Sequence, residues 1–141
     1  MRSKRETVYV VDPDLAVHDA VTTLLCSSSI DVRCYSTAEA YLESNPPHAV
    51  GTGYLLVEAD LPGMGSLAFV RQLHTQNANL PIVVLASTSD RDIAAQALKA
   101  GAVDVFDKPL ISGRLLDRLR SAVSRNALVD TQRNQFLNDN P

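Results

Sequence analysis

The chain has little of what would mark a secreted, membrane-spanning or metal-binding protein. It contains two cysteines, Cys26 and Cys34, and no tryptophan among 141 residues. Neither cysteine has a histidine at a metal-type spacing, so two small buried apolar residues are favoured over a disulfide or a redox pair. The apolar run Val8–Val11 is too short for a signal peptide or a membrane helix. We therefore expect a cytosolic protein without membrane contact.

Neither sign of charge dominates the sequence. The chain has 13 Lys and Arg against 16 Asp and Glu, a net charge of -3, so no global field attracts nucleic acid. The sequence also lacks a P-loop, a dinucleotide-binding glycine spacing and a Ser-His-Asp arrangement. We expect a single domain, because the length is short for two ordinary ones, and we expect no enzymatic activity.

What the sequence does have is a regular alternation of two periods. Short apolar runs predict strands over 7–11, 30–35, 54–57, 81–86 and 102–106. Apolar residues at helical spacing follow each run, beginning with the stripe from Leu15 to Leu25. Continuous apolar strands that alternate with helices indicate a parallel sheet covered on both faces. Right-handed crossovers then favour an α/β, flavodoxin-like (βα)5 fold with strand order 2-1-3-4-5.

Polar residues mark where several of the helices begin. Ser36 with Glu39 three residues later has the pattern of a capping box. Asp14 and Asp90 stand where side chains can cap the first and fourth helices. Gly101 stands where the fourth helix should end.

Charged residues stand at the carboxyl ends of the predicted strands, where parallel sheets place their functional crevice. Asp12 and Asp14 follow the first strand, Glu58 ends the third, and Lys108 follows the fifth. Such a group could hold Mg²⁺, which prefers oxygen ligands. It could equally be a structural network of ion pairs with no chemistry.

The order of the motifs resembles the receiver domains of two-component response regulators, from about Thr7 to about Val123. The most specific element is a Lys-Pro turn that follows Ala-Gly-Ala-x-Asp. The matching segments are Val10-Val11-Asp12-Pro13-Asp14, Leu56-Val57-Glu58-Ala59-Asp60-Leu61-Pro62, Val83-Val84-Leu85-Ala86, Ala100-Gly101-Ala102-Val103-Asp104 and Asp107-Lys108-Pro109.

The resemblance implies a metal and phosphoacceptor site from which this chain departs. In a working receiver, two adjacent acidic residues hold Mg²⁺ and an Asp ending the third strand accepts the phosphoryl group. Asp12 matches the first acidic position, but Pro13 occupies the second and has no carboxylate. Asp14 lies one residue further along. Glu58 replaces the phosphoacceptor Asp.

The resemblance also implies a switch, and most of its parts are changed. Ala86 replaces the Ser or Thr that holds a phosphoryl oxygen. Val105 replaces the aromatic reporter, while Phe106 should point to the opposite face of the strand. Lys108 keeps the family's residue.

These departures favour an atypical receiver, a pseudo-receiver that works without phosphorylation and needs no cofactor. A salt bridge from Glu58 to Lys108 could imitate the phosphorylated state, although the missing hydroxyl and aromatic argue against full mimicry. The alternative is a working phosphoacceptor that uses Glu58 or Asp60 with Mg²⁺. Expected partners are another protein, a second copy or a histidine kinase, bound at the face of the fourth helix, fifth strand and fifth helix.

We expect the receiver-like domain to span residues 1–125, with 126–141 as a polar linker or tail. Receivers often precede a DNA-binding output domain, so the resemblance suggests a role in transcription through a domain outside this chain. DNA contact would come only from that domain. The arginines of the last helix are expected to form a solvated or dimer-forming face, namely Arg114, Arg118, Arg120 and Arg125.

Overall fold

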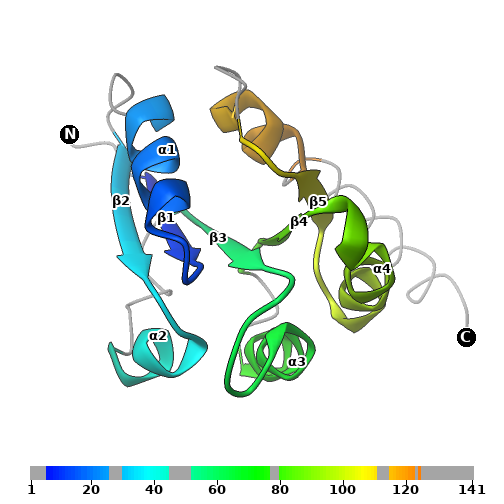
Figure 1. Cartoon of the computed structure of the whole chain (residues 1–141). Coiled ribbons are helices and arrows are strands. Elements are labelled where there is room, and N and C mark those ends of the chain that lie inside the picture. The colour runs from blue at the N-terminus through cyan, green and yellow to red at the C-terminus, as the bar shows by residue number, and fades with distance from the viewer. Residues whose placement is uncertain are drawn as a thin grey trace, which may run out of the picture.

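A computed structural model describes residues 6–25, 30–44, 52–76, 80–110, 115–122 and 124. Within these residues, five parallel strands form one sheet in the order β2-β1-β3-β4-β5 (Figure 1). The strands are β1 (Glu6–Val11), β2 (Ile30–Tyr35), β3 (Thr52–Glu58), β4 (Ile82–Ala86) and β5 (Asp104–Asp107). The predicted fold class and strand order are confirmed.

Helices cover both faces of the sheet (Figure 1). Helix α1 (Leu15–Leu25) and the helical residues 115–122 pack on one face. The other face carries α2 (Ala38–Ser44), α3 (Ser66–Gln76) and α4 (Arg91–Ala100). A 3-10 turn, η1 (Thr88–Asp90), leads into α4. No helix in the described part of the chain is long and apolar enough to cross a membrane.

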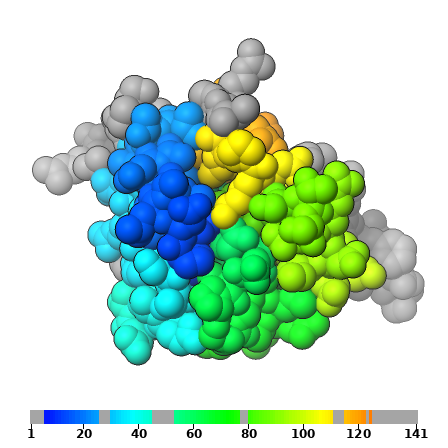
Figure 2. Space-filling view, viewed as in Figure 1, coloured from blue at the N-terminus to red at the C-terminus, as the bar shows by residue number. Residues whose placement is uncertain are grey.

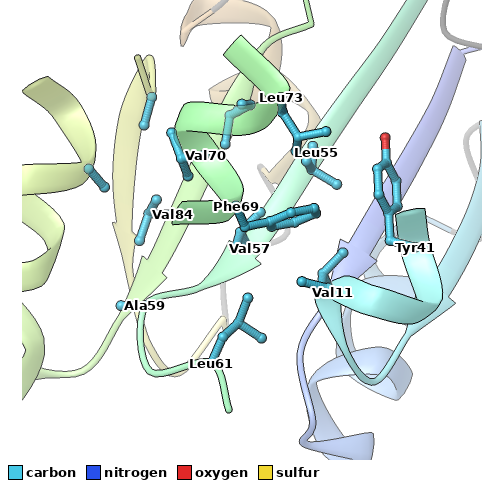
Figure 3. Packing of buried hydrophobic residues seen from close by; sticks show 14 of the residues in the cluster. Val11, Tyr41, Leu55, Val57, Ala59, Leu61, Phe69, Val70, Leu73 and Val84 are labelled. Carbon is cyan, nitrogen blue, oxygen red and sulfur yellow. The ribbon is translucent and has the colours of Figure 1, made fainter. Parts of the chain in front are cut away.

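The sheet divides the core into two clusters, because successive strand residues point to opposite faces. Val10 and Leu56 pack toward α1, whereas Val11 and Val57 pack toward α2 and α3. In the second of these clusters, Phe69 lies beside Val57 and Val11 (Figure 3). Burial on both faces explains why the strands are apolar throughout.

Of the helix caps predicted at Asp14, Asp90 and Gly101, the one at Asp90 differs from the prediction. Asp14 caps α1 as predicted, since its Oδ1 accepts the amide of Ala16 at 2.9 Å. Asp90 stands before α4 but makes no side-chain cap there. Its Oδ2 instead accepts the amide of Ser87 at 3.3 Å, which closes the η1 turn. Gly101 ends α4 with a φ of 130°, a conformation that favours glycine.

The predicted capping box at Ser36 is wrong. Thr37 is the capping residue of α2, because its Oγ1 accepts the amide of Ala40 at 3.0 Å. Glu39 points away from its own helix and accepts the amide of Met64 at 3.3 Å. A contact with the β3–α3 loop therefore replaces a local one, and it joins segments that are distant in sequence.

The structure also limits the apolar stripe of α1 and contradicts the predicted burial of Cys34. Leu15 belongs to the apolar stripe in sequence but is 65% exposed, while Val17, Val21 and Leu25 form the buried face of α1. Cys34 is exposed on the edge strand β2, so it is not a small core residue. Cys26 lies outside the described residues.

The two ends of α1 allow a matched test of this packing. Leu25 is 1% exposed, so Leu25→Ala should lower the free energy of unfolding by about 3 kcal/mol through lost burial and a residual cavity. Leu15→Ala should change it by less than about 0.5 kcal/mol. Urea unfolding followed by circular dichroism measures both. Equal losses would contradict the assigned face of α1.

Candidate functional site

The parallel pairing brings the predicted acidic residues together at one edge of the sheet. Val11 of β1 pairs with Val57 of β3, so the residues that follow them, Asp12 and Glu58, lie side by side. Lys108 follows β5, and its amide donates to the carbonyl of Ala86 at the end of β4 at 3.0 Å. This bond holds the β5 turn over the carboxyl ends of the central strands.

The core of the site is one ammonium shared by two buried carboxylates. Lys108 Nζ lies 2.9 Å from Oδ2 of Asp12 and also forms an ion pair with Oε2 of Glu58. The side chains of Asp12 and Glu58 are 1% and 7% exposed, and that of Lys108 is 17% exposed. Apart from Lys108, no hydrogen-bond donor among the described residues reaches these two oxygens, so their charge is balanced by its ammonium.

Backbone amides satisfy the other two carboxylate oxygens. Oδ1 of Asp12 accepts the amide of Asp14 at 2.8 Å. Oε1 of Glu58 accepts the amide of Asp60 at 3.1 Å. Each carboxylate is therefore fixed between its own loop and Lys108, which leaves little freedom for either side chain to turn toward a ligand.

The electrostatics of the site depend on burial as well as charge. Burial raises the pKa of Glu58 and the negative charge of Asp12 adds to this, whereas Lys108 and the amide of Asp60 oppose it. Burial alone would lower the pKa of Lys108, but its bonds to Glu58 and Asp12 raise it. The lysine contribution to stability is thus complete below its ordinary pKa and is lost only at higher pH. Because its pKa is raised, Glu58 contributes most to stability at acidic pH. This contribution is lost as the pH rises above the ordinary pKa of a glutamate.

The residues present do not fit Mg²⁺, the ion that the family resemblance implies. Pro13 is exposed and has no carboxylate, and Asp14 uses its Oδ1 to cap α1. The oxygens of Asp12 and Glu58 are bound by Lys108 and backbone amides. The described residues hold no group of three or more acidic, histidine or cysteine side chains arranged for a metal. Mg²⁺ takes oxygen ligands in near-octahedral geometry, which this site does not offer.

The other predicted positions lie around the site but do not complete it. Ala86 is buried, and its methyl group lies where the family resemblance implies a hydroxyl. Val105 packs on the α3–α4 side of the sheet, whereas Phe106 is buried on the α1 side. Asp60 is exposed in the loop after β3, so its carboxylate does not join the ion pair with Lys108.

One residue of the site was missed from the sequence. His18 is half-buried, and its Nε2 lies 2.7 Å from the carbonyl oxygen of Asp12. The only signal was its place one helical turn after Asp14. Of the other histidines, His74 is exposed at the end of α3 and His48 lies outside the described residues.

A groove opens beside the site between the start of α1 and the turn after β5. Its volume is about 490 Å³, and Figure 2 shows the yellow end of β5 against the blue start of α1. Most of its lining is apolar. The lining residues are Asp14, Ala16, Val17, Ala20, Ser87, Lys108, Pro109 and Leu110.

Comparison with known proteins identifies the family. The response regulator receiver domain matches residues 8–120 of the chain, and the chain belongs to this family. It is 33% identical over 123 residues to the response regulator protein TodT of Pseudomonas putida, covering 87% of this chain and 53% of that protein. The receiver domain is a module of two-component signalling rather than a typical enzyme.

Two further relatives agree with this assignment. The transcriptional regulatory protein FixJ of Bradyrhizobium diazoefficiens is 29% identical over 82% of this chain and 56% of its own length. The solved structure of the response regulator StyR superimposes with a TM-score of 0.73 at 30% identity, covering 93% of this chain and 65% of that one. The chain thus spans about half the length of the curated relatives it matches.

Removing the shared ammonium tests the electrostatics of the site. Lys108→Met leaves two buried carboxylates without a counter-charge, so it should destabilise the domain by about 3 kcal/mol near neutral pH. The loss should be smaller in acidic than in neutral buffer, because the raised pKa of Glu58 favours its protonation, which relieves the repulsion. Urea unfolding at both pH values measures it.

Lys99→Met is the matched control, since Lys99 is exposed on α4. It should change the free energy of unfolding by less than about 0.5 kcal/mol at either pH. A Lys108→Met loss that does not depend on pH would contradict the role of Glu58 in the network.

Proposed function

We propose that this domain is an atypical receiver that signals without phosphorylation, through contacts with another protein. The observation that carries this proposal is the pairing of Lys108 with both Asp12 and Glu58. In a phosphorylated receiver, a lysine at this position binds the phosphoryl group. Here its ammonium already has two anionic partners, and the charge that a phosphoryl group would bring is largely supplied by the protein.

The position of Glu58 also opposes phosphoryl transfer. Its side chain is one methylene longer than Asp, which moves the carboxylate by about 1 Å and disturbs the alignment that in-line transfer needs. One carboxylate oxygen is bound by Lys108 and the other by the amide of Asp60. Charge neutralisation by metal is a main source of rate in phosphoryl transfer, and Pro13 removes a carboxylate that would hold one.

The switch lacks the groups that would distinguish two states. A ligand shifts a conformational equilibrium only if it interacts differently with the two states. Ala86 offers no hydroxyl to a phosphoryl group, and Val105 has no ring to move. We therefore favour a domain fixed in one conformation over one in which Glu58 fully imitates the phosphorylated state.

The contacts of this domain are proposed to lie on α4, β5 and the helical residues 115–122. Leu98 of α4 is one of the large hydrophobic side chains exposed in the described structure, at 45%. We propose a second copy of this chain or another protein, such as a histidine kinase, as the partner at this face.

The relatives suggest a place for the domain in transcription. FixJ is named a transcriptional regulatory protein, and the chain matches only about half of it. We propose that residues 1–125 form the receiver domain and that 126–141 serve as a linker or tail. An attached output domain would then be the part that binds DNA.

Treatment with a small phosphodonor and Mg²⁺ tests the proposed phosphate independence. Intact mass spectrometry should detect no phosphoryl adduct on the wild-type chain, because the metal set and the nucleophile are both changed. The combined variant Pro13→Asp, Glu58→Asp and Ala86→Thr restores the family's groups and serves as the matched control, which should gain an adduct. An adduct on Glu58 or Asp60 of the wild type, or saturable Mg²⁺ binding, would support the phosphoacceptor alternative.

A charged side chain introduced on α4 tests whether the chain self-associates at this face. Leu98→Glu places a carboxylate in the proposed contact and should shift the chain toward monomer by at least about tenfold in the dissociation constant. Leu15→Glu changes the same residue type on the opposite face of the sheet and should leave the constant unchanged. Sedimentation velocity over a concentration series measures both. A wild-type chain that stays monomeric at every concentration would exclude the homodimer.

A further inference from the structure

Arginine contacts as well as apolar packing hold the helical residues 115–122 on the sheet. Leu115, Leu119 and Ala122 are buried, and the first two pack in the α1-side cluster. The arginines on this helix were expected to face solvent or a dimer partner. Arg118 and Arg120 are exposed, as expected, but they also bind groups on the sheet.

Arg118 stacks on an aromatic ring of the last strand. Its Cζ lies 3.9 Å from the ring centroid of Phe106, well within the range of a cation–π contact. Phe106 is 1% exposed and packs in the same cluster as Leu115 and Leu119. The ring is thus covered by the guanidinium on one side and by the core on the other.

Arg120 binds a carboxylate of the first strand. Its Nη2 donates to Oε1 of Glu6 and its Nε lies 3.4 Å from Oε2. Tyr54 of β3 donates its hydroxyl to the same carboxylate. The bonds from Arg120 outweigh the effect of burial and lower the pKa of Glu6, so this carboxylate is charged at neutral pH.

The two contacts act on opposite sides of the helix. Residues two apart are separated by about 200° around a helix axis, so Arg118 and Arg120 flank the apolar face on different sides. Phe106 belongs to the edge strand β5, while Glu6 and Tyr54 belong to β1 and β3 on the far side of β4. Rotation of the helix in either direction would break one of the two contacts.

We propose that Arg118 and Arg120 form a two-point clamp that fixes the orientation of the helical residues 115–122 on the sheet. The clamp keeps the orientation of this helix relative to the sheet constant. It does not depend on the proposed phosphate independence, because its contacts lie apart from Lys108. A phosphoryl adduct on Glu58 would refute that function and leave the clamp intact.

Hydrogen exchange of the full chain tests the clamp. The double variant Arg118→Gln and Arg120→Gln should raise the exchange rate of the helix amides about tenfold, whereas peptides from β1 and β3 keep their rates. Each single variant should raise it about threefold, which provides a second measurement if the double variant folds poorly. Arg71→Gln on the exposed face of α3 is the matched control and should change nothing.

A distance measurement tests the orientation itself. Spin labels at Ser124 and Thr23, both exposed, in a background with Cys26→Ser and Cys34→Ser should give a narrow distribution that broadens in the double variant. Three results would overturn the clamp: helix exchange and label distances that stay unchanged, an equal effect from Arg71→Gln, or acceleration spread evenly over the whole domain.

Discussion

Two buried carboxylates share one ammonium in this domain, and this imbalance of charge determines the electrostatics of the site. Asp12 and Glu58 are nearly inaccessible to water, and Lys108 is the cation that reaches both. Removing one partner from a buried ion pair costs more than the pair contributes. The three residues therefore act as a unit, and the site behaves as a structural network more than as an open binding pocket. The same imbalance raises the pKa of Glu58, through burial and the neighbouring charge of Asp12.

The fold tolerates these changes because the sheet does not depend on the site's chemistry. The strands are held by parallel pairing and by apolar clusters on both faces, and a parallel sheet of this order brings its strand ends together whatever residues occupy them. Pro13 and Ala86 therefore replace family residues without disturbing β1 or β4. The surfaces of α4 and β5 likewise do not depend on the residues of the site, and the proposed function places its contacts there.

The sequence was sufficient to predict the features that depend on hydrophobic periodicity and on the residues at the strand ends. The apolar runs predicted the five strands, and the right-handed crossovers predicted their order. The positions of Asp12, Glu58 and Lys108 at the strand ends predicted the charged cluster. The misses depend on tertiary contacts that no local pattern encodes. Glu39 has a capping-box spacing but binds the β3–α3 loop. Leu15 fits the apolar stripe of α1, but it lies in the first turn of the helix and is exposed. Arg118 and Arg120 are exposed as predicted, but their contacts with Phe106 and Glu6 could not be predicted, because the partners lie on strands far away in sequence.

The first strand connects the two electrostatic features of the molecule. Glu6 begins β1 and binds Arg120, while Asp12 directly follows β1 and binds Lys108. Both cations come from the C-terminal part of the chain, and Glu6 and Arg120 are 114 positions apart. Contacts of such separation form only after a large loop-closure cost has been met by the rest of the fold. The helical residues 115–122 therefore pack on the sheet and are also bound to its first strand by an ion pair. Strand β1 thus carries the acidic partner of Arg120 at its first residue and is followed directly by an acidic partner of Lys108.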